Sequence, residues 1–274
     1  MATFQTFDQD NDVIKNQRTV VSSGIFSGGS GTMTSFYSQS AQGASTGSYI
    51  DVYHQDPTAG SATVDTAEIQ FSLGYAHYWG SGSAGNTTKL NTGGRQTAAL
   101  YRQFANVILP AETSKFTFTG AESASDDFYF VTFQRARQRE KIDPGNWELH
   151  LSGSGATSTL KLIDDSGATT NPTVNEGGRV FNIISGSIAT GTAVTNTTAA
   201  NQPGGAYGLF YPDLGIILLH PSVLEASGSL KASRTSDTYG DNPHNFFLSV
   251  ATGSKFQVRR EEEISSTNYF CRVN

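Results

Sequence analysis

The chain contains a single cysteine, Cys271, among its 274 residues. One cysteine excludes an intramolecular disulfide framework and a zinc site built from several thiolates, so we expect Cys271 to be a small, partly buried apolar residue. Charged residues are also scarce, at 15% of the chain against about 25% in ordinary globular domains. The net charge of −6 argues against a nucleic-acid partner and against a polybasic membrane anchor.

Long apolar runs are absent as well. The longest, Leu214–Leu219, is far shorter than the roughly 20 residues that a membrane span needs. The first twenty residues carry early aspartates and no apolar core segment, so they do not have the pattern of a secretory signal. These absences predict a protein that stays in the compartment of its synthesis and has no membrane anchor.

What the chain has instead is Ser, Thr, Asn and 29 glycines, a composition that favours strands and turns over helices. We predict a mainly β (β-rich α+β) fold of antiparallel sheets packed like a sandwich, with one or two short helices. Residues 1–48 are expected to form an extended glycine-rich arm, and 49–274 a single β-rich domain. The pattern at 268–274 is still that of a strand, which favours completion by a partner or by further chain.

Individual elements follow from the period of the apolar residues. One helix is expected at 97–109, ended by Pro110, and a short helical turn at 221–224. A Pro-Gly turn is expected at 141–146 and a loop at 187–205. The expected strands are 49–53, 67–75, 115–119, 127–133, 147–151, 159–163, 180–184, two strands around a Pro-Asp turn in 207–220, 246–250, 255–258 and 268–273.

No sequence motif for catalysis or cofactor binding is present. The glycine-rich segments lack the spacing of phosphate-binding loops, and the five histidines are isolated from one another in the sequence. The paired carboxylates Asp126-Asp127, Asp164-Asp165 and Glu261–Glu263 occur at turns, strand edges or beside arginines, where structural roles are more common than acid–base catalysis. We therefore predict no catalytic, cofactor-binding or metal-binding residue, and a protein that is not an enzyme.

Two charged segments are candidate interfaces. Alternate residues of the run after 127–133 are basic, and on a continued strand they would form one cationic stripe, which protects a sheet edge or docks an acidic neighbour. The second segment joins two arginines to a run of glutamates and is typical of a solvated or subunit-bridging cluster. The candidate interface residues are Arg135, Arg137, Arg139, Lys141, Arg259, Arg260, Glu261 and Glu262.

Several blocks of the sequence resemble virion structural proteins of contractile-tailed cyanophages. The longest is 125–153, which reads SDDFYFVTFQRARQREKIDPGNWELHLSG, and further blocks lie at 14–19, 162–166, 178–187, 207–221 and 262–273. The resemblance implies a non-enzymatic tail or baseplate component, most similar to wedge proteins, assembled in the host cytoplasm and located in the virion. Its implied partners are other tail or baseplate proteins and copies of itself, and the arm is expected to wrap a neighbour by strand addition.

Two other function classes remain open. A host-surface binding module would present a concave aromatic sugar site, for which Tyr78, Trp79 and Trp147 are the candidates. Trp147 alternates with Leu149 and Leu151, so we expect it in the core rather than in such a site. A cell-wall hydrolase would require two essential carboxylates at a fixed separation, which the sequence alone does not reveal.

Overall fold

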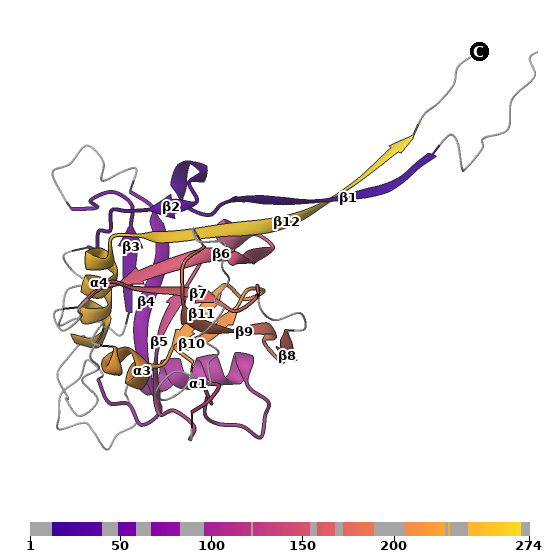
Figure 1. Cartoon of the computed structure of the whole chain (residues 1–274). Helices are drawn as coiled ribbons and strands as arrows, with labels where there is room; N and C mark the ends of the chain where they lie inside the picture. Colours follow the sequence, from indigo (N-terminus) through magenta and orange to yellow (C-terminus); the bar gives the residue numbers. More distant parts are fainter. Residues whose placement is uncertain are drawn as a thin grey trace, which may run out of the picture.

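The computed structural model describes residues 13–39, 49–58, 67–82, 96–121, 123–153, 158–167, 172–188, 206–227, 230 and 241–269. Within them the chain is mainly β and antiparallel, as expected, with one 12-stranded sheet in place of two packed sheets (Figure 1). The strands are β1 (Val13–Gly24), β2 (Thr32–Met33), β3 (Tyr49–Tyr53), β4 (Ile69–His77), β5 (Asp127–Thr132), β6 (Lys141–Leu151), β7 (Leu160–Asp164), β8 (Thr173–Asn175), β9 (Gly178–Ser185), β10 (Gly208–Tyr211), β11 (Ile216–Leu219) and β12 (Phe256–Tyr269). The helices are η1 (Ser27–Gly29, 3₁₀), α1 (Gln96–Ile108), α2 (Arg135–Gln138), α3 (Pro221–Ala226) and α4 (Asp241–Gly253).

The sheet curls until strands from its two ends pack against each other. Its order is β1-β12-β6-β7-β9-β10-β11-β5-β4-β3, so β12 and β4 lie near opposite ends. Yet the rings of Phe256 on β12 and Phe71 on β4 are 5.1 Å apart, and Phe26 lies 5.9 Å from the first and 6.4 Å from the second. We call this junction the seam. Side-chain packing closes the sheet here, because β12 and β4 share no ladder of hydrogen bonds.

The segment between β1 and β3 bridges the seam. Met33 on β2 pairs with Phe256 on β12, and four residues later Tyr37 exchanges backbone hydrogen bonds of 3.1 and 2.8 Å with Tyr53 on β3. Phe26 and Met33 are buried in the same core cluster as Phe256. Part of the expected arm, residues 25–37, therefore belongs to the body of the fold.

Apolar side chains cover both faces of the sheet. The inner face holds Trp147, which is fully buried as expected, among residues of β4, β5, β6, β9 and β12. The outer face of β4, β5, β10 and β11 packs on α1 and on the segment around Phe116 and Phe118. The Tyr101 ring of α1 lies 4.9 Å from Phe128 of β5, and its hydroxyl donates a 2.6 Å hydrogen bond to the Ser125 carbonyl. The predicted helix at 97–109 is confirmed.

The segment 246–250 is helical, so the strand predicted there is wrong. It lies within α4, where Phe246, Phe247 and Val250 face the inner core at helical spacing. A short apolar run does not by itself separate a buried helix from a strand. The helix ends so close to β6 that a Cβ on Gly253 would lie 2.1 Å from the His150 carbonyl oxygen, which explains the glycine.

Three other sequence-based elements differ from the structure. The strand predicted at 115–119 is a single bridge between Phe116 and Ser125, because the segment packs on the outer face rather than joining the sheet. The Pro-Gly turn at 141–146 is an irregularity within β6, where the pairing with β12 shifts register. The strands at 255–258 and 268–273 are joined through 259–267 in the single strand β12, which reaches Tyr269. Most of the expected loop at 187–205, and Cys271, lie outside the described residues.

β1 and β12 continue beyond the body as a two-stranded ribbon (Figure 1). β12 pairs with β6 only as far as Glu261, whereas its pairing with β1 runs from Arg259 to Tyr269. We define the ribbon as residues 13–21 of β1 and 262–269 of β12. No further strand of the described chain pairs with either outer edge of this ribbon. Apart from the Glu263 amide, which donates a 2.7 Å hydrogen bond to the Glu140 carboxylate, its outer edges have no partner strand in the described chain and can accept another strand.

Removing the ring at the centre of the seam should destabilise the fold. Phe71 is fully buried and contacts the rings of Phe26, Phe36, Phe133 and Phe256. We expect Phe71→Ala to lower the free energy of unfolding by about 3–5 kcal/mol, measured by urea denaturation. The exposed Val107→Ala on α1 is the control and should change it by about 0.5 kcal/mol or less. Equal effects of the two substitutions would contradict this account of the seam.

Candidate functional site

The four basic residues after β5 do not form a cationic stripe, so the prediction that the strand continues through them is wrong. Residues 135–138 form the single helical turn α2, and Arg139 adopts a left-handed conformation with φ of 59°. The turn forms because Gln138, rather than a basic residue, is buried. Its Nε2 donates hydrogen bonds of 3.2 and 2.9 Å to the carbonyls of Pro212 and Asp213, in the β10–β11 turn.

Each of these cations has a partner within the chain. Arg137 pairs with Glu68 at 2.8 Å, Arg139 with Glu262 at 2.9 Å and Lys141 with Glu261 at 2.9 Å, while Arg135 donates a long 3.4 Å hydrogen bond to the Asp213 carbonyl. Arg260 also pairs with Glu262, at 3.1 Å. The structure thus brings six of the eight candidate interface residues together where the ribbon leaves the body. Arg135 lies apart at the β10–β11 turn, and Arg259 lies exposed beside Gly31.

A cleft of about 670 Å³ opens beside this root of the ribbon. Its walls come from segments far apart in the sequence, namely the residues that follow β2 and β3, the start of β4, α2 and β12. The lining residues are Gln39, Tyr53, Pro57, Ala67, Glu68, Ile69, Gln134, Ala136, Arg137 and Arg260. Both arginines of the lining are ion-paired, Arg137 with Glu68 in the same lining and Arg260 with Glu262.

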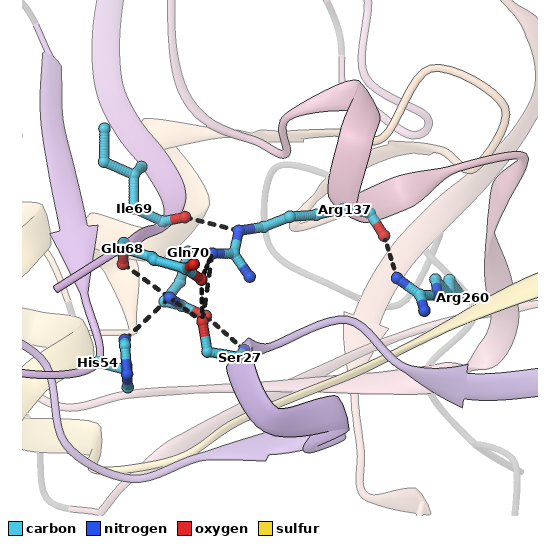
Figure 2. Close-up of polar contacts among 7 residues, drawn as sticks. All are labelled: Ser27, His54, Glu68, Ile69, Gln70, Arg137 and Arg260. Carbon is cyan, nitrogen blue, oxygen red and sulfur yellow. Dashed lines mark hydrogen bonds and ion pairs between the residues drawn. The ribbon is translucent and has the colours of Figure 1, made fainter. Parts of the chain in front are cut away.

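The Arg137 guanidinium, which lines the cleft, is held by two segments, η1 and residues 68–69 at the start of β4 (Figure 2). Its Nε donates to the Ile69 carbonyl at 2.6 Å, and its Nη2 lies 2.8 Å from a Glu68 carboxylate oxygen and 3.3 Å from the Ser27 hydroxyl. Arg260 donates from Nη1 to the Arg137 carbonyl at 3.0 Å and from Nε to the Ser23 hydroxyl at 2.9 Å. The hydrogen bonds from Ser27 and Arg137 hold the pKa of the Glu68 carboxyl below its usual range.

Gln70 connects Ser27 and Glu68, two of the residues that contact Arg137. Its fully buried side chain accepts a 2.9 Å hydrogen bond from the Ser27 amide and donates to the Glu68 carbonyl at 2.7 Å. Its Nε2 also lies 3.0 Å from Nδ1 of His54. Ser27, Glu68 and Gln70 are not distinguishable as site residues in the sequence, because only the closed seam places η1 beside β4.

Each of the two cleft arginines keeps one terminal nitrogen for further bonding. Arg137 Nη1 and Arg260 Nη2 have no hydrogen-bond partner among the described residues. The two side chains are only 14% and 16% exposed, so their geometry is set by the protein rather than by solvent. A guanidinium nitrogen held in this way can donate a charge-assisted hydrogen bond to a carboxylate or a phosphate.

A second, smaller feature is an exposed aromatic pair. Trp79 is 63% exposed and lies edge-to-face with Tyr78, their ring centroids 4.8 Å apart. Lys115 places its Nζ 4.6 Å from the Tyr78 centroid and 5.3 Å from that of Trp79, and it pairs with Asp126 at 2.5 Å. Trp147 takes no part, because it lies in the core.

The paired carboxylates make structural hydrogen bonds. Asp127 is buried and accepts a 2.8 Å hydrogen bond from the Tyr75 hydroxyl. Asp164 accepts from the amides of Gly145 and Ser166, at 2.9 Å each, and thereby fixes the irregularity in β6, although burial raises the pKa of its carboxyl. Asp165 binds the Asn182 amide groups. No group of three or more His, Cys, Asp or Glu side chains within the described ranges is arranged to hold a metal ion.

The buried acid Glu148 was not anticipated from the sequence. Its side chain is 1% exposed and lies 2.5 Å from His150 Nε2 and 3.0 Å from Lys255 Nζ. Burial alone would raise the pKa of Glu148, but hydrogen bonds from His150, Lys255, Ser187 and the Ile188 amide lower it to about 2. This cluster links β6 to the end of β9 and to the start of β12, so its role is structural.

Comparison with known proteins assigns this chain to no family. No family model, curated protein or solved structure matches this chain. None of the helices described above is long and apolar enough to cross a membrane.

The Glu148 cluster predicts a pH dependence of stability. Because the folded-state pKa of about 2 lies below the ordinary 4.5, ionised Glu148 stabilises the fold at neutral pH, and this contribution of about 3 kcal/mol is lost as the pH falls from about 5 to 2. Glu148→Gln should therefore be strongly destabilised at pH 7, and its deficit should shrink to less than half near pH 3, in urea unfolding at each pH. The exposed Glu112→Gln is the control and should track the wild type throughout. A Glu148→Gln deficit that is constant from pH 7 to 3 would refute this assignment.

Proposed function

We propose that this chain is a non-enzymatic structural subunit of a contractile phage tail or baseplate, which joins its neighbours through the β1–β12 ribbon. The observation that supports the proposal is the ribbon itself. Two strands paired only with each other are marginally stable in water, and they gain stability when a further strand or surface packs on them. A ribbon of this kind is suited to forming an interface.

The side chains of the ribbon favour this function. Val20, Val21 and Ile264 are 60%, 40% and 51% exposed, although β-branched apolar residues are usually found on buried sheet faces. Thr19 pairs with Ile264 and Val21 with Glu262, so Val21 and Ile264 lie on one face, while Val20 lies on the other. Both faces therefore offer apolar surface to a partner, and neither outer edge is paired with another strand of the described chain.

The position in a phage tail or baseplate rests on the resemblance of the sequence blocks to virion proteins. Many of the charged side chains at the root of the ribbon are paired within the chain. An interface of such a subunit would therefore depend on complementary shape, apolar contacts and backbone pairing. A partner that binds only the folded state also stabilises it by mass action.

A host-surface sugar-binding module is the second candidate, favoured by the exposed Trp79 beside Tyr78. An exposed indole is suited to stacking on a sugar ring, and the adjoining Lys115–Asp126 pair offers hydrogen-bonding groups for hydroxyls. In a glycan array, saturable binding that Trp79→Ala abolishes would favour this function over the structural one.

The structural proposal is tested on tail particles purified from infected cells. We expect cryo-electron microscopy to place this chain in the tail or baseplate, with the ribbon buried between subunits. The double variant V21D/I264D should fold but fail to enter particles, because it puts charges on a ribbon face that we expect to be buried between subunits. Val107→Asp on α1 is the matched control and should be incorporated normally. Particles that lack the chain, or that accept V21D/I264D, would overturn the proposal.

A further inference from the structure

An acidic segment directly precedes the ribbon in the sequence. Residues 1–12, MATFQTFDQDND, contain Asp8, Asp10 and Asp12 and no lysine or arginine. This segment directly precedes Val13, which pairs with Tyr269 at the outer end of the ribbon. Each copy of the chain therefore carries three carboxylates within five residues, along the sequence, of the outer end of the ribbon.

The cleft has the chemistry to bind such a segment. Arg137 Nη1 and Arg260 Nη2 line it without a hydrogen-bond partner in the described chain, and their remaining nitrogens are fixed by protein groups. Carboxylates form strong charge-assisted hydrogen bonds with guanidinium groups held in this way. Tyr53, Pro57 and Ile69 add apolar surface on which an extended peptide can pack.

The length of the ribbon prevents a chain from filling its own cleft. Ser23, which binds Arg260, marks the cleft end of β1, and the ten residues from there to Val13 span about 33 Å at about 3.3 Å per residue. Asp8, the farthest of the three aspartates from Val13, is five residues away and reaches back at most about 18 Å. None of the three carboxylates can return to the arginines of the same copy.

We propose that the acidic segment Asp8–Asp12 of one copy binds the Arg137–Arg260 cleft of a second copy. The inference rests on the proposed structural function and names a partner for it, namely another copy of this chain. The contact is head-to-tail, because the two surfaces that meet are different. Such a contact generates a ring when the rotation between copies closes and a filament when it does not.

A peptide titration tests the contact directly. The probe is a fluorescent peptide of residues 1–14, added to the full-length chain carrying D8N/D10N/D12N so that no acidic segment competes for the cleft. We expect saturable binding by anisotropy that weakens at least tenfold when the three aspartates of the peptide are asparagines. Raising the salt from 50 to 500 mM should weaken it similarly, because screening reduces the attraction between charges. Equal binding of the two peptides, or no binding, would overturn the proposal.

A variant of the cleft tests the location without disturbing the fold. Gln39 and Gln134 line the cleft, are exposed, and make no side-chain hydrogen bond with the described residues, so Q39E/Q134E adds two negative charges while keeping the shape. It should abolish peptide binding, whereas the matched control Gln103→Glu, exposed on α1, should bind as before. Binding that survives in Q39E/Q134E would place the peptide elsewhere and refute the proposed site.

Sedimentation velocity tests self-association of the intact chain. At low salt the wild type should form larger species with rising concentration, and both D8N/D10N/D12N and Q39E/Q134E should remain monomeric. Identical sedimentation of all three proteins would overturn the inference. If the chain is nevertheless found in tail particles with its ribbon buried, the structural function stands and the cleft binds no second copy. If the peptide binds but the particles lack the chain, the self-contact stands and the phage assignment fails.

Discussion

The closure of the seam is the constraint on which the rest of the structure depends. A curled sheet whose ends do not hydrogen-bond to each other exposes both its edges and the inner core, unless another segment covers the gap. Here Phe26 packs between Phe71 and Phe256, and the residues from Met33 to Tyr37 pair with both sides. The N-terminal segment is thus part of the core. The same closure puts Ser27 beside Glu68 and so creates the wall of the cleft.

The closure of the seam also determines which groups of the ribbon remain available to partner proteins. The basic run after β5 and the acidic run of β12 meet at the root of the ribbon and neutralise each other, as in the pairs Arg139–Glu262 and Lys141–Glu261. These exposed or half-exposed pairs contribute little stability individually, but they fix the direction in which β12 leaves the body. Beyond Glu261 the ribbon has only its own two strands. Backbone edges and β-branched side chains, rather than unpaired charges, are what the ribbon presents.

The spacing of apolar residues predicted an element correctly where that element buries the same face along its whole length. Helix α1 and the strands β5, β9, β10 and β11 each bury a face that alternation or helical spacing reveals. It failed for α4, because Phe246–Val250 is apolar at positions that suit both periods. The prediction of a cationic stripe after β5 was also wrong. Charges at alternate positions lie on one face only if the backbone stays extended. Burial of Gln138 under the β10–β11 turn bends the chain there instead.

By itself, the sequence determined the mainly β class, the burial of Trp147 and the positions of most strands along the chain, because these follow from local spacing of apolar residues. It also located the charged residues that meet at the root of the ribbon. Only the tertiary structure decided that the N-terminal and C-terminal strands are neighbours, that Ser27, Glu68, Gln70 and Arg137 form one network, and that Glu148 is a buried ion. The physical reason is that each of these contacts joins residues far apart in the chain, whose approach depends on how the whole sheet curls and closes.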